Sequence, residues 1–173
     1  QVVGKRTIDA GYKEAGAYAG GKVIQEIGGG ICQVSSTLYN AVLYADLEIV
    51  ERSNHYFETS YVTAGRDATV SWGTVDFKFK NNRTYPIKIE AVAKNGINKI
   101  SILGIKEEKE YEIVIQSKVT SIIEQEIKYE NDYSIPYGEE EVEQPGHNGC
   151  TSKTYIIKKL NGATVSTEEI TSD

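Results

Sequence analysis

The sequence predicts an α+β fold in which an N-terminal helix packs on an antiparallel sheet, followed by a small, elongated all-β domain. Three observations carry this prediction. One segment has helical periodicity and directly follows three consecutive glycines. Stretches of alternating apolar and polar residues come after it, as in strands with one solvated face. The last third of the chain has only strand-like patterns and turns that contain glycine.

The helix is expected from about Cys32 to Tyr44. Apolar residues recur there at three- and four-residue steps, at Ile31, Val34, Leu38, Ala41, Val42 and Ala45. Before it, Gly28, Gly29 and Gly30 allow backbone conformations that are closed to other residues. Cys32 therefore falls at a helix N-terminus, where unpaired N–H groups and the helix dipole favour a thiolate over a thiol.

The strands that complete the first domain, residues 1–104, follow the helix. They are expected at 47–52, 55–62, 68–72, 75–80, 85–93 and 99–103. A turn at 94–96 joins the last two into a hairpin. Together with the helix, this layout is compatible with transglutaminase-like and papain-like enzymes.

The charged stretch 106–110 marks a change in composition, which places the second domain at 105–173. Alternating runs and the dipeptide Asn161-Gly162, a strong hairpin signal, indicate a β domain. Few large apolar residues are available there for a core, which suits a stalk or a binding module better than an enzyme.

Composition restricts the class of protein. The 173 residues carry a formal net charge of −6, which argues against a general nucleic-acid-binding surface. No apolar run is long enough to span a membrane, and the first residues do not resemble a signal peptide. The chain begins at Gln1 and contains no Met, so we expect an excised fragment whose signal or anchor lies outside it. The 12 tyrosines suit either half-buried strands or polar ligands such as sugars.

Cys32 is the candidate nucleophile, with His55 as its base and Asp76 or Asp67 as the acid that orients the base. Transglutaminase-like and papain-like enzymes have the same order of Cys, His and acid. Asp76 is preferred because it lies on the polar side of an alternating strand, whereas Asp67 lies in a turn that it could cap. Backbone N–H groups at the helix start would stabilise an oxyanion, with help from Gln25 or Gln33.

A binding role without catalysis is the alternative. The polar residues Gln33, Ser35, Ser36, Thr37 and Asn40 follow one flank of the helix. The candidates for substrate binding come from this flank, from the glycine turn before it and from the segment after the helix. They are Gly29, Gly30, Gln33, Ser35, Ser36, Asn40 and Arg52. Cys32 would then be a small buried apolar residue, and His55 a structural one. No cofactor is expected, and Cys32, His55 and His147 lack the spacing of a zinc site.

The segment 28–41, containing Gly-Gly-Gly-Ile-Cys-Gln-Val-Ser-Ser-Thr, resembles the VanW family of bacterial envelope proteins. The similarity continues through Glu51-Arg52-Ser53-Asn54-His55, residues 61–70 and residues 75–81. It covers roughly residues 1–104, and its N-terminal edge looks clipped. Thr63 stands where the family commonly has proline. The family takes its name from vancomycin-resistance gene clusters.

Residues from about 105 onward resemble a G-five domain, a small β module named for its glycines. The segments 137–140 and 144–149 and the pair Asn161-Gly162 carry this similarity. Cys150 departs from it, because a residue without a thiol is expected at that position. The resemblance implies a surface protein and binding to polymers that contain N-acetylglucosamine.

The two resemblances imply an extracellular protein at the surface or in the wall of a Gram-positive bacterium, with peptidoglycan as its partner. Two hypotheses remain open. In one, Cys32, His55 and an aspartate carry out thiol acyl transfer or hydrolysis at peptide amide bonds. In the other, the chain is a non-catalytic cell-wall module that recognises the peptidoglycan stem peptide and N-acetylglucosamine glycan.

Overall fold

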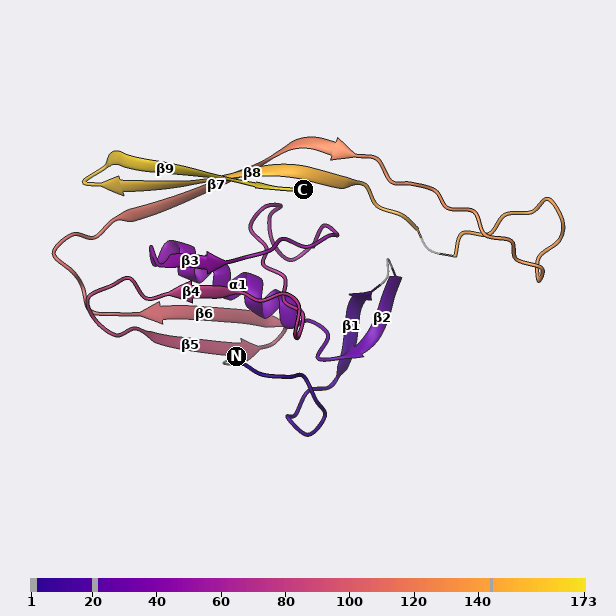
Figure 1. Cartoon of the computed structure of the whole chain (residues 1–173), viewed down its shortest axis with the longest axis horizontal. Helices are drawn as coiled ribbons and strands as arrows, with labels where there is room; N and C mark the ends of the chain where they lie inside the picture. The colour runs from indigo at the N-terminus through magenta and orange to yellow at the C-terminus, as the bar shows by residue number, and fades with distance from the viewer. Residues whose placement is uncertain (1–2, 20–21, 144) are drawn as a thin grey trace.

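The computed structural model of the chain describes residues 3–19, 22–143 and 145–173 (Figure 1). Within these residues there are one α-helix and nine β-strands. The elements are β1 (Glu14–Ala19), β2 (Lys22–Ile27), α1 (Ile31–Tyr44), β3 (Glu48–Glu51), β4 (Lys78–Lys80), β5 (Lys88–Lys94), β6 (Ile97–Leu103), β7 (Glu112–Ile123), β8 (Gly149–Leu160) and β9 (Ala163–Ser172). In the part of the chain so described, no helix is both long and apolar enough to cross a membrane.

The predicted α+β fold with one helix on one antiparallel sheet is wrong. The structure consists mostly of strands, and its helix has 14 residues. The strands form four separate antiparallel sheets, β1–β2, β3–β4, β5–β6 and β7–β8–β9. The strand expected at 55–62 is an irregular segment instead. Alternation in a sequence identifies strands with one wet face, but it does not say which strand pairs with which.

Two tight turns account for two of the strand pairings. Asn95 and Asn161 have φ angles of 53° and 52°, and the glycine after each also has positive φ. Such turns join consecutive strands into hairpins, so that backbone hydrogen bonds are satisfied locally. The predicted turns at 94–96 and 161–162 are present on this basis, as the connections of β5 to β6 and of β8 to β9.

Helix α1 lies between strands of three of the sheets. It contacts β3, β6 and β7, and Figure 1 shows the β7–β8–β9 sheet on one side of it and the β5–β6 hairpin on the other. The core is built on Tyr39, Leu43 and Ala68. Partly buried residues pack against this core from both halves of the sequence, namely Ile49, Phe77, Ile115 and Ile156.

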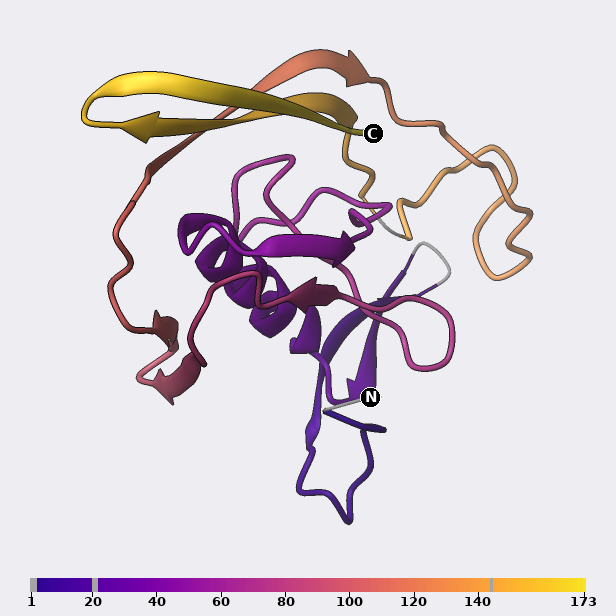
Figure 2. The ribbon, with the colours of Figure 1, turned by 60° about the vertical axis from the view of Figure 1, so that its left-hand side comes forward.

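The C-terminal strands are attached to the first half of the chain by polar contacts as well. The buried Thr154 hydroxyl donates to the Gly65 carbonyl at 3.1 Å. At the C-terminal end, an Arg52 N–H donates to Ser172 Oγ at 2.8 Å. Figure 2 shows the resulting arrangement, in which the β7–β8–β9 sheet lies over α1. The division at residue 104 stays a prediction, and the structure adds that the two sides of it share one core.

The start of α1 depends on its glycines. Gly30 caps the helix with a φ of 86°, a left-handed conformation that other residues rarely adopt. At Gly29 a side chain would overlap the Ala15 carbonyl of β1. The helix therefore begins at Ile31, and Cys32 lies in its first turn, which contains no acidic residue.

Candidate functional site

The Cys32 side chain is held between the first turn of α1 and the segment that follows Asp67. Its Sγ atom lies 3.5 Å from the Val70 carbonyl oxygen and 3.6 Å from the Thr69 hydroxyl. The residue is neither fully buried nor exposed, and it is a free thiol, as is Cys150. Cys32 is thus fixed in position and still accessible.

His55 and Asp67 form the second part of the site. The Nδ1 atom of His55 lies 2.6 Å from Oδ2 of Asp67, and the His55 backbone N–H donates to the same oxygen, also at 2.6 Å. Arg52 binds the other carboxylate oxygen at 3.0 Å and the Asp67 carbonyl at 2.7 Å. The buried carboxylate is therefore fully paired, and it fixes the orientation of the imidazole.

The third relationship joins His55 to Cys32. Burial opposes ionisation of the Cys32 thiol, but hydrogen bonding with His55, helped by Val70 and Thr69, outweighs it, so the pKa of Cys32 is lowered. Burial also opposes protonation of His55, yet its hydrogen bonds with Asp67 and Cys32 raise the pKa of His55 to about 9. Burial would likewise favour the neutral form of Asp67, but hydrogen bonds from His55 and the charge of Arg52 lower its pKa. The lowered pKa of Cys32 and the raised pKa of His55 both favour the thiolate–imidazolium pair over the neutral thiol and imidazole.

Tyr61 completes the cluster, and it is not among the site residues predicted from the sequence. Its hydroxyl lies 3.2 Å from Nε2 of His55, and its ring packs edge-on against the imidazole. Burial raises the pKa of Tyr61 to about 12, with the negative charge of Cys32 adding to the effect. The phenol therefore stays neutral. It lies in the irregular segment expected to be a strand, so its direction could not be read from alternation.

The structure brings Asp67, and not Asp76, beside His55. The Asp76 carboxylate accepts a hydrogen bond from the backbone N–H of its neighbour Phe77 at 2.9 Å. Two contacts hold Asp67 in place instead. The backbone N–H of the next residue, Ala68, donates to Ser36 of α1, and the Arg52 guanidinium donates to the Asp67 carboxylate. Of the two candidate acids, Asp67 is therefore the one that lies beside His55, although Asp76 was preferred from the sequence.

Most of the polar flank of α1 is used for internal hydrogen bonds. Ser35 donates to the Ala68 carbonyl at 2.6 Å, and Ser36 accepts from the Ala68 N–H at 2.9 Å. Both serines are buried. The Asn40 amide donates at 2.7 Å to the carbonyls of both Ser36 and Arg66. Arg52, another expected ligand-binding residue, is engaged by Asp67 and Ser172 as described above. These side chains hold the segment 66–70 against the helix.

The remaining candidates lie in β2, in the turn before α1 and in the first turn of the helix. Gln25 and Gln33 are exposed, and Gly29 and Gly30 form the turn before α1. The backbone N–H groups of Ile31 and Gln33 donate to the carbonyls of Gly28 and Gly30. Among the described residues, no backbone carbonyl of the turn before α1 accepts a hydrogen bond from the Cys32 N–H. It is therefore the donor best placed to bind an anion that forms next to Sγ.

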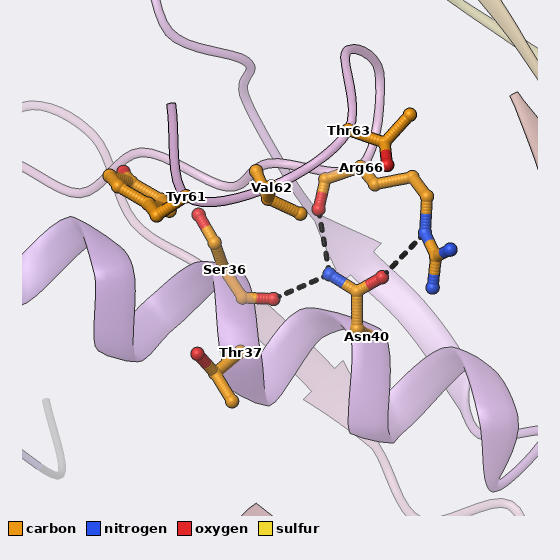
Figure 3. A pocket seen from close by; sticks show the side chains of 7 residues that line it. All are labelled: Ser36, Thr37, Asn40, Tyr61, Val62, Thr63 and Arg66. Carbon is orange, nitrogen blue, oxygen red and sulfur yellow. Dashed lines mark hydrogen bonds between the residues drawn. The ribbon is translucent and has the colours of Figure 1, made fainter. Parts of the chain in front are cut away.

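A cavity of about 320 Å³ lies beside α1, and we call it the helix pocket (Figure 3). Its lining residues are Ser36, Thr37, Asn40, Tyr61, Val62, Thr63 and Arg66. Tyr61 belongs both to this pocket and to the Cys32 site. A smaller cavity of about 80 Å³ lies between the two halves of the chain, where His55, Asp67 and Cys150 are among its lining residues. Among the described residues, no group of three or more His, Cys, Asp or Glu side chains is arranged to hold a metal ion.

Comparison with known proteins places the chain in a family. The model of the family described as VanW like protein matches residues 1–103, and that of the G5 domain matches residues 114–173. The protein YoaR of Bacillus subtilis (strain 168), whose name marks it as uncharacterized, is 55% identical over 91 residues, which cover 53% of this chain and 30% of YoaR. The vancomycin B-type resistance protein VanW of Enterococcus faecalis (strain ATCC 700802 / V583) is 37% identical over 86 residues, covering 46% of this chain and 31% of that protein.

The matched part of the chain thus spans about a third of the length of these two relatives. No solved structure matches the chain. The combination of VanW and G5 domains is that of a cell-wall associated protein of the cell envelope. Because the first model matches more than half of the chain, the protein belongs to the VanW-like family and carries a G5 domain in its C-terminal part.

Proposed function

We propose that this protein is a cysteine-dependent enzyme of the Gram-positive cell wall that cleaves or transfers peptide amide bonds of peptidoglycan. The observation that supports it is the contact of His55 with both Cys32 and Asp67, which lowers the pKa of the thiol and raises that of the imidazole to about 9. A structural cysteine needs no such partner. The family membership supports the location, and the residues support the chemistry.

In the first half of the reaction, the Cys32 thiolate attacks the carbonyl carbon of the amide, and a bond forms between Sγ and that carbon. The negative charge moves to the carbonyl oxygen, where the Cys32 backbone N–H at the helix N-terminus stabilises it. When the C–N bond breaks, the His55 imidazolium gives its proton to the departing amine. The product is a thioester between the acyl group and Cys32.

In the second half, neutral His55 takes a proton from a water molecule or from a second amine. The oxygen or nitrogen then attacks the thioester carbon, and the C–S bond breaks to return Cys32 as a thiolate beside imidazolium. Asp67 keeps Nδ1 protonated throughout, so that Nε2 faces the reaction. Water gives hydrolysis, and an amine gives a new amide bond.

The test uses the full chain with purified peptidoglycan fragments, and mass spectrometry detects cleaved or newly joined peptides. Cys32→Ala is expected to abolish turnover while the fragments still bind. Cys150→Ala is the matched control, because it removes the other thiol and is expected to retain activity. Turnover that survives in Cys32→Ala would refute the proposal.

A second function, glycan binding by the G5 half, is favoured by three exposed tyrosines. Tyr129, Tyr133 and Tyr137 lie on the long segment between β7 and β8 and are 73%, 95% and 107% exposed. Aromatic rings presented to solvent can pack against sugar rings. Replacing all three with Ala in the full chain is expected to reduce its sedimentation with purified peptidoglycan. Unchanged sedimentation would remove these tyrosines from glycan recognition.

A further inference from the structure

We propose that the helix pocket binds a free carboxylate of the peptide substrate through Arg66, about three to four residues from the bond that Cys32 attacks. This inference rests on the proposed function, because it names the part of the substrate that the same site recognises. It goes beyond the reaction, because it assigns a specificity residue outside the Cys32–His55–Asp67 cluster.

The first observation concerns the charge of Arg66. The other three arginines of the chain pair with carboxylates: Arg6 with Glu26, Arg52 with Asp67, and Arg83 with Glu107 and Glu110. In the part of the chain that the structure describes, Arg66 forms no ion pair, although the protein has a net charge of −6. A cation that lines a cavity without a carboxylate partner indicates an anionic ligand.

The second observation is that the Arg66 guanidinium is held in place. Its Nε atom donates to Oδ1 of Asn40 at 2.8 Å, and one terminal nitrogen donates to the Tyr44 hydroxyl at 3.0 Å. The guanidinium also lies over the Tyr44 ring, 5.5 Å from its centroid. Figure 3 shows Asn40 between Ser36 and Arg66, bonded to both. These neutral partners fix the planar group without cancelling its charge, which is the arrangement that a carboxylate-binding arginine needs.

The third observation is that the pocket shares Tyr61 with the Cys32 site. Tyr61 lines the pocket, and its hydroxyl lies 3.2 Å from His55 Nε2. Asn40, which holds the Arg66 guanidinium, comes eight residues after Cys32 in α1. Eight residues of helix rise about 12 Å. An extended peptide covers this distance in about three to four residues at roughly 3.3–3.6 Å each.

A carboxylate and a phosphate would both fit an unpaired guanidinium. The carboxylate is favoured because Tyr61 lines the pocket and also contacts His55, which lies beside the thiol proposed to attack a peptide bond. Peptidoglycan stem peptides carry free carboxylates within a few residues of their amide linkages.

The experiment measures binding separately from turnover. In a Cys32→Ala background, a fluorescently labelled stem peptide with its carboxylates free is titrated by anisotropy, beside the same peptide with each carboxylate converted in turn to a carboxamide. One carboxamide peptide is expected to bind about tenfold to a hundredfold more weakly, as for the loss of a charged hydrogen bond. Arg66→Gln is expected to weaken binding of the free peptide by the same factor and to remove the difference between the peptides.

Two variants control for charge and folding. Lys80→Gln removes one exposed positive charge elsewhere and is expected to leave the affinities unchanged. Arg66→Lys keeps the charge and loses the planar fork, so an intermediate affinity is expected with an unchanged melting temperature.

Carboxamide peptides that bind as tightly as the free peptide would overturn the proposal. Competition by inorganic phosphate but not by acetate would overturn it in favour of a phosphate ligand. Neither result would affect the proposed function, whose own test is the loss of turnover in Cys32→Ala.

Discussion

Oδ2 of Asp67 accepts two hydrogen bonds from His55, one from the backbone N–H and one at Nδ1, each at 2.6 Å. A single carboxylate oxygen therefore fixes both the main chain and the ring of the same residue. This explains how an irregular segment can hold an imidazole in one orientation. It also makes Asp67 the natural acid of the proposed Cys32 site, although the position of Asp76 in the sequence favoured that residue.

Asp67→Asn is expected to lower the pKa of His55 from about 9 toward its ordinary value of 6.5, because the hydrogen bond and charge of Asp67 raise it. Asp76→Asn is the matched control, since its carboxylate bonds to Phe77 instead. NMR titration of the imidazole resonances measures both, with His147 as the second histidine signal. Equal His55 pKa values in the two variants would contradict the assignment.

Alkylation of Cys32 by iodoacetamide is expected to begin at lower pH than that of Cys150. His55 lowers the pKa of Cys32, whereas burial raises the pKa of Cys150. In His55→Ala, the onset of Cys32 labelling should move upward toward that of an ordinary thiol, about 8.5. Peptide mapping after labelling between pH 4 and 9 gives both rates from one sample. If Cys32 is labelled only after unfolding, it is a core residue.

The stability of Cys32→Ser is expected to fall as pH rises from 6.5 toward 9. A histidine whose folded pKa is raised stabilises the protein fully below its unfolded pKa and loses that contribution as pH passes the folded value. Asp67 keeps the His55 pKa raised in this variant, so we expect a loss of about 1–2 kcal/mol. In the wild type, the lowered pKa of Cys32 acts in the opposite direction over the same range and offsets the loss.

Urea unfolding at pH 6 and pH 9 measures this change. The double variant Cys32→Ser/His55→Gln serves as the reference, because it retains every other titrating group. The difference between the two variants isolates His55, and a difference that does not change with pH would show that its folded pKa is not raised.

Thr154→Val is expected to lower the free energy of unfolding by about 1–3 kcal/mol, the cost of leaving a buried acceptor without its donor. The Thr154 hydroxyl is fully buried and donates to the Gly65 carbonyl, two residues before Asp67. Thr164→Val, on the exposed part of β9, is the control and should change stability little. If the two variants are equally stable, this contact does not attach the C-terminal strands to the site.

The sequence by itself determined the local features of this protein. Apolar spacing predicted the helix, which the structure has as α1. The pairs Asn95-Gly96 and Asn161-Gly162 predicted two hairpins, because residues that tolerate positive φ are needed there. The glycines before Cys32 predicted its place at the helix start for the same reason. Each of these features depends on residues that are close together in the chain.

Only the tertiary structure decided which distant residues meet. Three two-stranded sheets replaced the single sheet expected in residues 1–104, since alternation does not specify strand partners. Asp67 lies beside His55 because Arg52 and the Ala68 contacts to α1 hold it there, and no local pattern encodes that choice. The serines of the helix flank are bonded inward for the same reason, whereas Arg66 keeps its charge unpaired among the described residues. Long-range hydrogen bonds and packing determine these contacts, and local periodicity in the sequence does not specify them.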